Sequence, residues 1–135
     1  MTLTITKEFE FDSSHRLIDS KLNKKENQKV FGKCFNYPSH GHLYRLFVTV
    51  EGFHLFNGMT INFSNLKEIV NKKVIRIFDH NFINDLECMK GKISTCENMV
   101  LVIWNLLEWD LAKENVVLRE IKLYETPTSC ATLTK

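Results

Sequence analysis

The sequence predicts an α+β fold in which helices cover one side of an antiparallel sheet. Two observations lead to this prediction. Near both ends of the chain, apolar and polar residues alternate as they do in half-buried strands, whereas in the middle apolar residues recur at the spacing of an amphipathic helix. The predicted order of elements is strand, loop, strand, helix, helix, strand and short strand.

Two alternating segments predict the first two strands. In residues 2–15 the even positions up to Asp12 hold Thr, Glu and Asp, and the odd positions include Leu3, Ile5, Phe9, Phe11 and His15. In residues 40–50 one face consists of His40, His42, Tyr44, Leu46, Val48 and Val50. If the two strands pair with these faces together, three histidines meet at one end of a buried surface.

The later elements follow in the same way. Apolar residues at helical spacing predict a helix at 63–78: Phe63, Leu66, Ile69, Val70, Val74, Ile77 and Phe78. A second helix begins with a capping-box pattern, in which Ser94 is the N-cap and Glu97 lies at N3. It continues through Val100, Leu101, Ile103, Trp104, Leu107 and Leu111. Residues 116–125 form a strand with Val117, Ile121, Leu123 and Glu125 on one face, and 128–133 form a short final strand.

Length and composition limit the class of protein. With 135 residues, 44% of them hydrophobic and 25% charged, we expect one folded domain over residues 1–135. The net charge of +2 is too balanced to indicate nucleic-acid binding. The basic stretch 21–25 is short and is interrupted by Glu26, so it is predicted to be a solvated loop.

The expected location is the cytoplasm. The first residues show no signal-peptide pattern, and no apolar run is long enough to span a membrane. The four cysteines lack the spacing of a disulfide framework, so we expect free thiols in a reducing compartment: Cys34, Cys88, Cys96 and Cys130.

The candidate metal ligands are His15, His40 and His42. Three imidazoles without an obvious fourth ligand favour a catalytic zinc site with an open position over a closed structural site. Iron or nickel would bind the same three side chains. Cys34 lies just upstream of two of the histidines, and a thiol beside a cation is held partly as thiolate, which makes it a base or a nucleophile.

Further candidates lie downstream. Asp79 and His80 follow the first helix directly; they are either polar surface residues or a carboxylate that orients an imidazole for proton transfer. Glu125 ends an apolar strand face and needs a partner, which an amino-pyrimidinone edge, a structural arginine or solvent would provide. Helix capping is a sufficient explanation for Thr95 and Glu97.

Taken together, these residues show that the chain resembles the 6-pyruvoyltetrahydropterin synthases and their bacterial relatives, the 6-carboxytetrahydropterin synthases. The resemblance covers nearly the whole chain. No single motif is specific, but six of them in order at suitable separations are. They are residues 11–17, 31–34 leading to 40–42, 58–63 leading to 66–67, 78–80, 94–98 and 124–126.

The resemblance implies the tunnelling fold (T-fold), a four-stranded antiparallel sheet with two helices on one face. Its subunits assemble into barrel-like trimers, and two trimers stack as a homohexamer with active sites at subunit interfaces. On the matching positions, His15, His40 and His42 look like the zinc ligands and Cys34 like the base. Asp79 and His80 complete its proton relay, and Glu125 looks like the pterin anchor, helped by the segment from Thr95 to Glu97.

The implied reaction is a lyase reaction on 7,8-dihydroneopterin triphosphate. Elimination of triphosphate and an internal redox change give 6-pyruvoyltetrahydropterin, on the way to tetrahydrobiopterin. The five-residue spacer between Cys34 and His40 favours this reaction, whereas residues 79–82 and 125–129 look more like the carboxy-type enzymes of queuosine biosynthesis. Phe35 and Tyr37 depart from the family's more usual Asn-Asn-Pro run. If they misplace Cys34, the chain is a zinc- or pterin-binding protein without activity; a structural oligomer of the same fold would bind no zinc.

Overall fold

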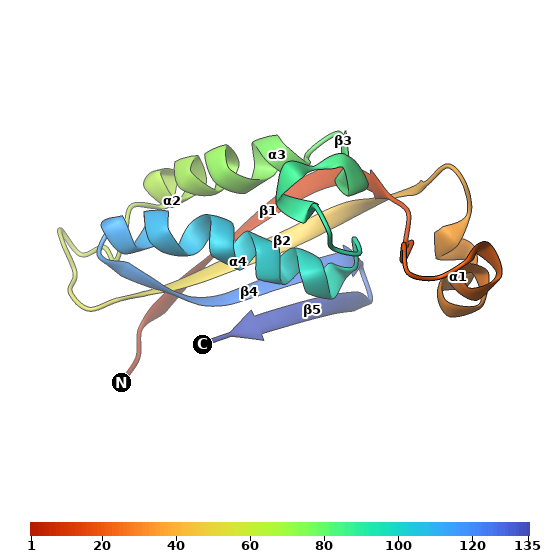
Figure 1. The fold of residues 1–135 in the computed structure, drawn as a ribbon. Coiled ribbons are helices and arrows are strands. Elements are labelled where there is room, and N and C mark those ends of the chain that lie inside the picture. The colour runs from red at the N-terminus through yellow and green to blue at the C-terminus, as the bar shows by residue number, and fades with distance from the viewer.

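The computed structural model describes residues 1–135 as a twisted sheet with helices against one face (Figure 1). The strands lie in the order β3-β1-β2-β4-β5. The four longer strands pair antiparallel, and the two-residue β3 pairs parallel with β1. Their bounds are β1 (Thr4–His15), β2 (His40–Gly52), β3 (Asn81–Phe82), β4 (Val116–Thr126) and β5 (Ser129–Thr134). The predicted α+β class is confirmed, but the sheet has five strands where four were expected.

The pairing of β1 with β2 brings the two predicted buried faces together. Phe11 lies opposite Tyr44, and their rings stack at 5.0 Å between centroids. Four residue pairs further along, His15 lies opposite His40. The alternating pattern therefore predicted this pairing correctly, and the buried face of the β1–β2 pair ends in imidazoles.

The helical layer consists of two long helical segments. The first combines α2 (Phe63–Val70), a π-helical turn η2 (Asn71–Ile75) and α3 (Arg76–Phe78), which confirms the helix predicted at 63–78. The second is α4 (Cys96–Lys113), and its N-cap is Thr95, whose side chain accepts a hydrogen bond from the amide of Asn98 at 3.2 Å. The predicted position of the N-cap, Ser94, was wrong by one residue. The hydroxyl of Ser94 is directed to the carbonyl of Arg16 and the side-chain oxygen of Asn84, so it does not cap the helix.

Between these segments the chain runs through two short 3₁₀ turns, η3 (Ile83–Asp85) and η4 (Glu87–Met89). Apolar side chains of the sheet and the helices form one core of 25 buried residues. The core includes Ile83 and Met89, so the 3₁₀ turns are anchored where they lead into α4. No helix in the structure combines the length and the hydropathy of a transmembrane segment.

A β-bulge changes which residues of β4 face the core. Leu118 lies opposite Val50, whereas Glu120 lies opposite Thr49, so Arg119 is an extra residue on this strand. An extra residue moves the following side chains to the other face. Leu118 is therefore buried before the bulge and Val117 is not, and the prediction that Val117 shares a face with Ile121 was wrong.

The sequence did not predict α1 (Lys24–Phe31). Its N-terminus has a capping box in which Asn23 and Glu26 each bond the other's backbone amide. Gly32 follows at φ +56°, a left-handed conformation that suits glycine, and starts the 3₁₀ turn η1 (Gly32–Phe35). Figure 1 shows α1 standing apart from the other helices at one end of the molecule. Because α1 buries only Asn27, it lacks the apolar stripe that would have shown it in the sequence.

Candidate metal and substrate site

Three imidazoles converge at the end of the β1–β2 pair. The ligand nitrogens of His15, His40 and His42 lie within 4.8 Å of one another. The Nε2 atom of each is buried and has no hydrogen-bond partner. A buried polar atom without a partner costs stability, and three such atoms pointing together are what a metal ion requires. The residues present therefore fit a metal held by three histidines.

The orientation of His15 is set from outside the sheet. Its Nδ1 lies 2.7 Å from the backbone carbonyl of Ser94, which directs the proton of the neutral ring to Nδ1 and leaves Nε2 free. Burial lowers the pKa of His15 to about 4, and burial also lowers the pKa of His42. Both rings are thus neutral at pH 7, which is the form that coordinates a metal.

Glu125 lies directly beside this group. Its Oε1 is 3.6 Å from Nε2 of His42, and the side chain is 26% exposed. The structure contains no arginine or lysine paired with Glu125, so the structural-arginine alternative is wrong. A half-buried carboxylate next to a candidate metal site is available to a ligand with N–H donors.

Cys34 lies in η1, on the segment that follows α1. The amide of Leu17 donates to the carbonyl of Cys34 at 2.9 Å, and this bond ties η1 to the residues that follow His15. The thiol is partly buried. It does not belong to the group of metal-ligating atoms, which contains the three histidines alone.

Asp79 and His80 form an ion-pair contact of 3.0 Å. The amide of Asp12 donates to Asp79 Oδ1 at 2.9 Å, and the amide of His80 donates to the carbonyl of Asp12 at 2.6 Å. The hydrogen bond from Asp12, followed by the one to His80, lowers the pKa of Asp79. His80 has φ +58°, a conformation that is rare without glycine, and its side chain is 78% exposed. The carboxylate therefore holds an imidazole that projects into solvent.

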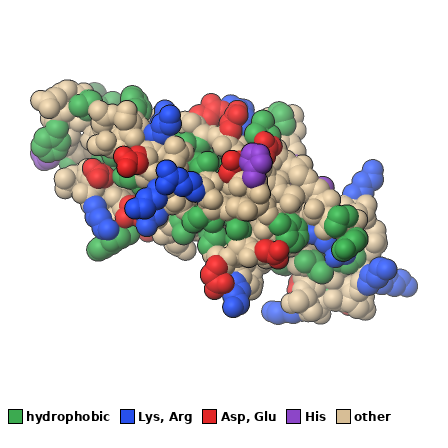
Figure 2. Space-filling model, turned by 90° about the horizontal axis from the view of Figure 1, so that it is seen from above, with side chains coloured by type: hydrophobic (Ala, Val, Ile, Leu, Met, Phe, Trp, Pro, Cys, Tyr) green, Lys and Arg blue, Asp and Glu red, His purple; other side chains and the backbone are tan.

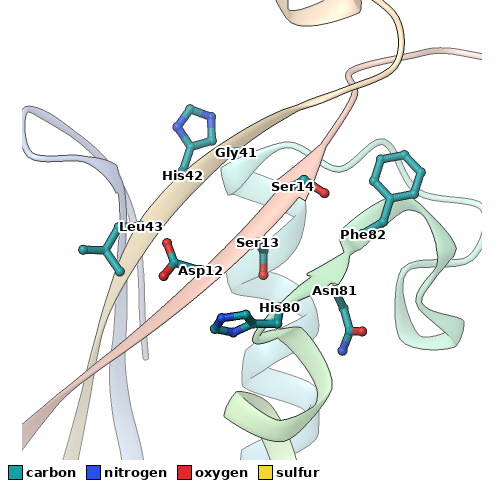
Figure 3. Close-up of a pocket in the computed structure, with 9 residues that line it drawn as sticks. All are labelled: Asp12, Ser13, Ser14, Gly41, His42, Leu43, His80, Asn81 and Phe82. Carbon is teal, nitrogen blue, oxygen red and sulfur yellow. The ribbon is translucent and has the colours of Figure 1, made fainter.

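A surface cavity of about 450 Å³ is lined by both His42 and His80. Figure 3 shows the two rings on opposite sides of β1. Within one chain the structure thus brings the three histidines and Glu125 together. It does not bring His80 to the same face.

The remaining predicted site residues lie at the start of α4. Thr95 caps the helix, and Glu97 is exposed in its first turn. Sequence reasoning missed two other residues beside the histidines. The backbone carbonyl of Ser94 accepts the hydrogen bond from His15. Tyr44 is fully buried, its hydroxyl has no hydrogen-bond partner, and the centre of its ring lies 5.6 Å from that of His42. Every residue has a backbone carbonyl, so the sequence cannot show which carbonyl binds His15. Tyr44 falls on the apolar face of its strand, which is typical of a core residue.

The chain is similar to known proteins over nearly its whole length. Residues 4–135 match the family model of 6-pyruvoyl tetrahydropterin synthase. The chain belongs to the 6-pyruvoyl tetrahydropterin synthase family. It is therefore an enzyme of the lyase type that acts in pterin synthesis.

Individual relatives support the assignment over nearly the whole chain. The 6-pyruvoyl tetrahydrobiopterin synthase of Dictyostelium discoideum is 42% identical over 127 residues, which cover 93% of this chain and 90% of the relative. The 6-carboxy-5,6,7,8-tetrahydropterin synthase of Haemophilus influenzae is 35% identical over 147 aligned positions, covering 93% and 94%. The structure of the Caenorhabditis elegans 6-pyruvoyl tetrahydropterin synthase superposes with a TM-score of 0.91 at 30% identity and covers 100% of this chain and 96% of that one.

Proposed function

We propose that residues 1–135 form one pterin synthase domain that converts 7,8-dihydroneopterin triphosphate to 6-pyruvoyltetrahydropterin and releases triphosphate. The observation that carries this proposal is the meeting of three imidazole nitrogens that lack hydrogen-bond partners with the carboxylate of Glu125, which pairs with no arginine or lysine. Such a site can hold a metal and a nitrogen-rich ring side by side.

His15, His40 and His42 would hold a zinc ion. Three neutral imidazoles would leave the ion its full positive charge, and zinc so bound would polarise oxygens and acidify the carbon-bound protons next to them. The chain's own contribution is to orient the ligands, as the hydrogen bond from His15 to Ser94 does.

Glu125 would anchor the pterin ring. Its carboxylate can accept two parallel hydrogen bonds from the amino group and the ring N–H of the amino-pyrimidinone edge. Thr95 and Glu97 lie at the start of α4. Cys96, which lies between them, donates through its thiol to the carbonyl of Leu123 on β4. This contact holds the Thr95–Glu97 segment near the strand that carries Glu125, where it can complete the pterin pocket.

Proton transfer would fall to Cys34, Asp79 and His80. Cys34 takes a proton from the substrate side chain, and His80, held by Asp79, relays protons with it. Because His80 lies on the other side of β1 from His42 within one chain and is largely exposed, it would serve the site of a neighbouring subunit in a homohexamer. The electrons stay within the substrate: the side chain is oxidised, the ring is reduced, and triphosphate leaves with the broken C–O bond.

A second candidate keeps the substrate and changes the product. In the carboxy-type reaction the end of the side chain leaves as acetaldehyde and 6-carboxytetrahydropterin forms, which leads to queuosine. The relative from Haemophilus influenzae favours this alternative. The spacer of five residues between Cys34 and His40 and the higher identity to the Dictyostelium enzyme favour the pyruvoyl product.

Incubation of the zinc-loaded protein with 7,8-dihydroneopterin triphosphate, followed by mass spectrometry, tests both candidates. We expect 6-pyruvoyltetrahydropterin and released triphosphate; 6-carboxytetrahydropterin with acetaldehyde would select the second candidate. The control is Cys34→Ala, which should retain zinc and lose turnover. Unchanged substrate with the wild-type protein would reject both reactions and leave a zinc- or pterin-binding protein.

A further inference from the structure

Arg16 is an oriented cation without an ionic partner. Its Nε donates to the carbonyl of Phe35 at 2.6 Å. Its guanidinium lies 4.2 Å from the centre of the Phe35 ring and 5.7 Å from that of Tyr37. The chain's seven ion pairs do not include Arg16, so its terminal amino groups stay available.

Arg16 lines a cleft next to the candidate site. The cleft has a volume of about 490 Å³, and besides Arg16 its polar lining includes Ser14, Ser39 and Asn84. Ser14 and Arg16 flank the candidate ligand His15, and Ser39 precedes His40 in the sequence. The cleft also shares Ser14 and Phe82 with the 450 Å³ cavity. A ligand at the histidines can therefore extend a tail toward Arg16.

The segment that begins at Arg16 and runs through α1 is strongly basic. Residues 16–33 contain six Lys or Arg and two Asp or Glu, a net charge of +4 in a chain whose total is +2. Both carboxylates already accept backbone hydrogen bonds, Asp19 from Lys21 and Glu26 from Asn23. Figure 2 shows Lys and Arg side chains projecting around the end of the molecule formed by α1, on the right. Such a field attracts polyanions toward the cleft.

We propose that Arg16 and its cleft bind the triphosphate tail of the substrate, with the lysines around α1 attracting it. This inference rests on the proposed substrate, which carries the pterin at Glu125 and the polyanion at the other end. An arginine fork matches phosphate oxygens with two donors at once. The guanidinium of Arg16 is already held by the hydrogen bond from its Nε to the carbonyl of Phe35 and by contact with the Phe35 ring. Because the side chain is ordered before the ligand binds, binding loses less conformational entropy.

The proposal gives a role to the two aromatic residues that depart from the family's Asn-Asn-Pro run. Phe35 is buried and Tyr37 is 85% exposed, and both pack against the guanidinium of Arg16. They are therefore positioning residues for the anion-binding group. In a relative with asparagines there, an arginine at the position of Arg16 would lack this aromatic support.

Separate ligands for the two ends of the substrate test the proposal. We would measure Kd by calorimetry for magnesium-saturated inorganic triphosphate and for 7,8-dihydroneopterin, which lacks phosphate, and verify the bound zinc afterwards. Arg16→Gln should raise Kd for triphosphate by about 10- to 100-fold, as expected for lost charged hydrogen bonds, and leave Kd for dihydroneopterin unchanged. Arg16→Lys should recover part of the affinity because it keeps the charge without the fork.

Two further variants keep the test decisive. Arg119→Gln removes the same charge on β4, six residues before Glu125, and should leave both Kd values unchanged. Tyr37→Asn changes an exposed side chain and should weaken triphosphate binding by about threefold, even if Arg16→Gln does not fold. Wild-type affinity for triphosphate in both Arg16→Gln and Tyr37→Asn, or in Tyr37→Asn alone if the other is unfolded, overturns the proposal.

The proposed reaction can fail independently. If the wild type forms a pterin product and triphosphate binding does not depend on Arg16, only the anion site is wrong. If the wild type forms no product and Arg16 still governs triphosphate binding, the anion site stands without that reaction.

Discussion

His15 and Ser94 are joined across 79 residues by a single hydrogen bond, 2.7 Å from the imidazole Nδ1 to the backbone carbonyl. The bond connects the end of β1 to the residue two before α4, and it decides which ring nitrogen faces His40 and His42. The candidate metal site therefore depends on the packing of α4 against the sheet as well as on the strands that carry the ligands.

The first prediction concerns metal content. Replacing His40 with alanine leaves two ligands, so bound metal should fall from about one ion per chain to near zero. Elemental mass spectrometry of the purified protein measures this directly. His54→Ala, in the loop after β2, is the matched control and should keep its metal. Full metal content in His40→Ala would show that the ion binds elsewhere.

The second prediction concerns pH and the metal-free protein. Burial lowers the pKa of His15 from 6.5 to about 4 in the folded state. Between these values the unfolded chain binds more protons, so stability is present above pH 6.5 and is lost as the pH falls toward 4. A difference of this size corresponds to about 3 kcal/mol. Denaturant unfolding at pH 7 and pH 4 should show this loss.

His15→Gln provides the comparison for the pH effect. The variant should lose less stability than the wild type over the same interval, because it lacks the buried group that takes up the proton. Carboxylates elsewhere titrate in both proteins and cancel in the difference. Equal losses in both proteins would mean that His15 does not control the acid sensitivity.

The third prediction concerns Tyr44. Its hydroxyl is buried without a hydrogen-bond partner, and burial followed by the nearby carboxylate of Glu125 raises its pKa. Tyr44→Phe removes an unsatisfied polar group and keeps the stack on Phe11, so we expect unchanged stability or a gain of about 1 kcal/mol. Tyr44→Ala should cost about 3–5 kcal/mol through the cavity it leaves. Thermal unfolding distinguishes the two, and a large loss in Tyr44→Phe would reveal a hidden partner.

The fourth prediction concerns the Asp79–His80 pair and rests on the proposed reaction. Asp79→Asn keeps the shape of the side chain and removes the charge that holds the imidazole. We expect kcat to fall by about 100-fold with little change in KM, since the pair moves protons and does not bind the pterin. Steady-state kinetics test this, with Asp85→Asn in η3 as the control. A change confined to KM would assign the pair to binding.

The fifth prediction separates the two candidate N-caps of α4. Thr95 accepts the hydrogen bond from Asn98, so Thr95→Ala should cost about 1 kcal/mol of stability. Glu97 takes no part in a capping box, so Glu97→Gln should leave stability nearly unchanged. Chemical unfolding measures both. A larger loss of stability in Glu97→Gln than in Thr95→Ala would contradict this assignment and favour the capping box predicted from the sequence, with Ser94 as the N-cap.

Elements with a strong hydrophobic pattern were predicted well. The helix at 63–78 and the pairing of β1 with β2 follow from apolar side chains that can be buried in only one way. Elements whose stability comes from polar contacts were missed. The capping box of α1 and the side-chain contacts of Ser94 replace burial with hydrogen bonds, which leave no periodic signal.

The same distinction applies to the candidate site. The sequence by itself determined that His15 extends the apolar face of one strand and that His40 and His42 lie on the apolar face of another; the predicted pairing of these faces is confirmed by the structure. Only the tertiary structure decided that the carbonyl of Ser94 orients His15, that His80 and His42 lie on opposite sides of β1, and that two aromatic rings contact Arg16. Those relationships join residues that are distant in the sequence or belong to irregular backbone. They depend on how separate elements pack, which no local pattern records.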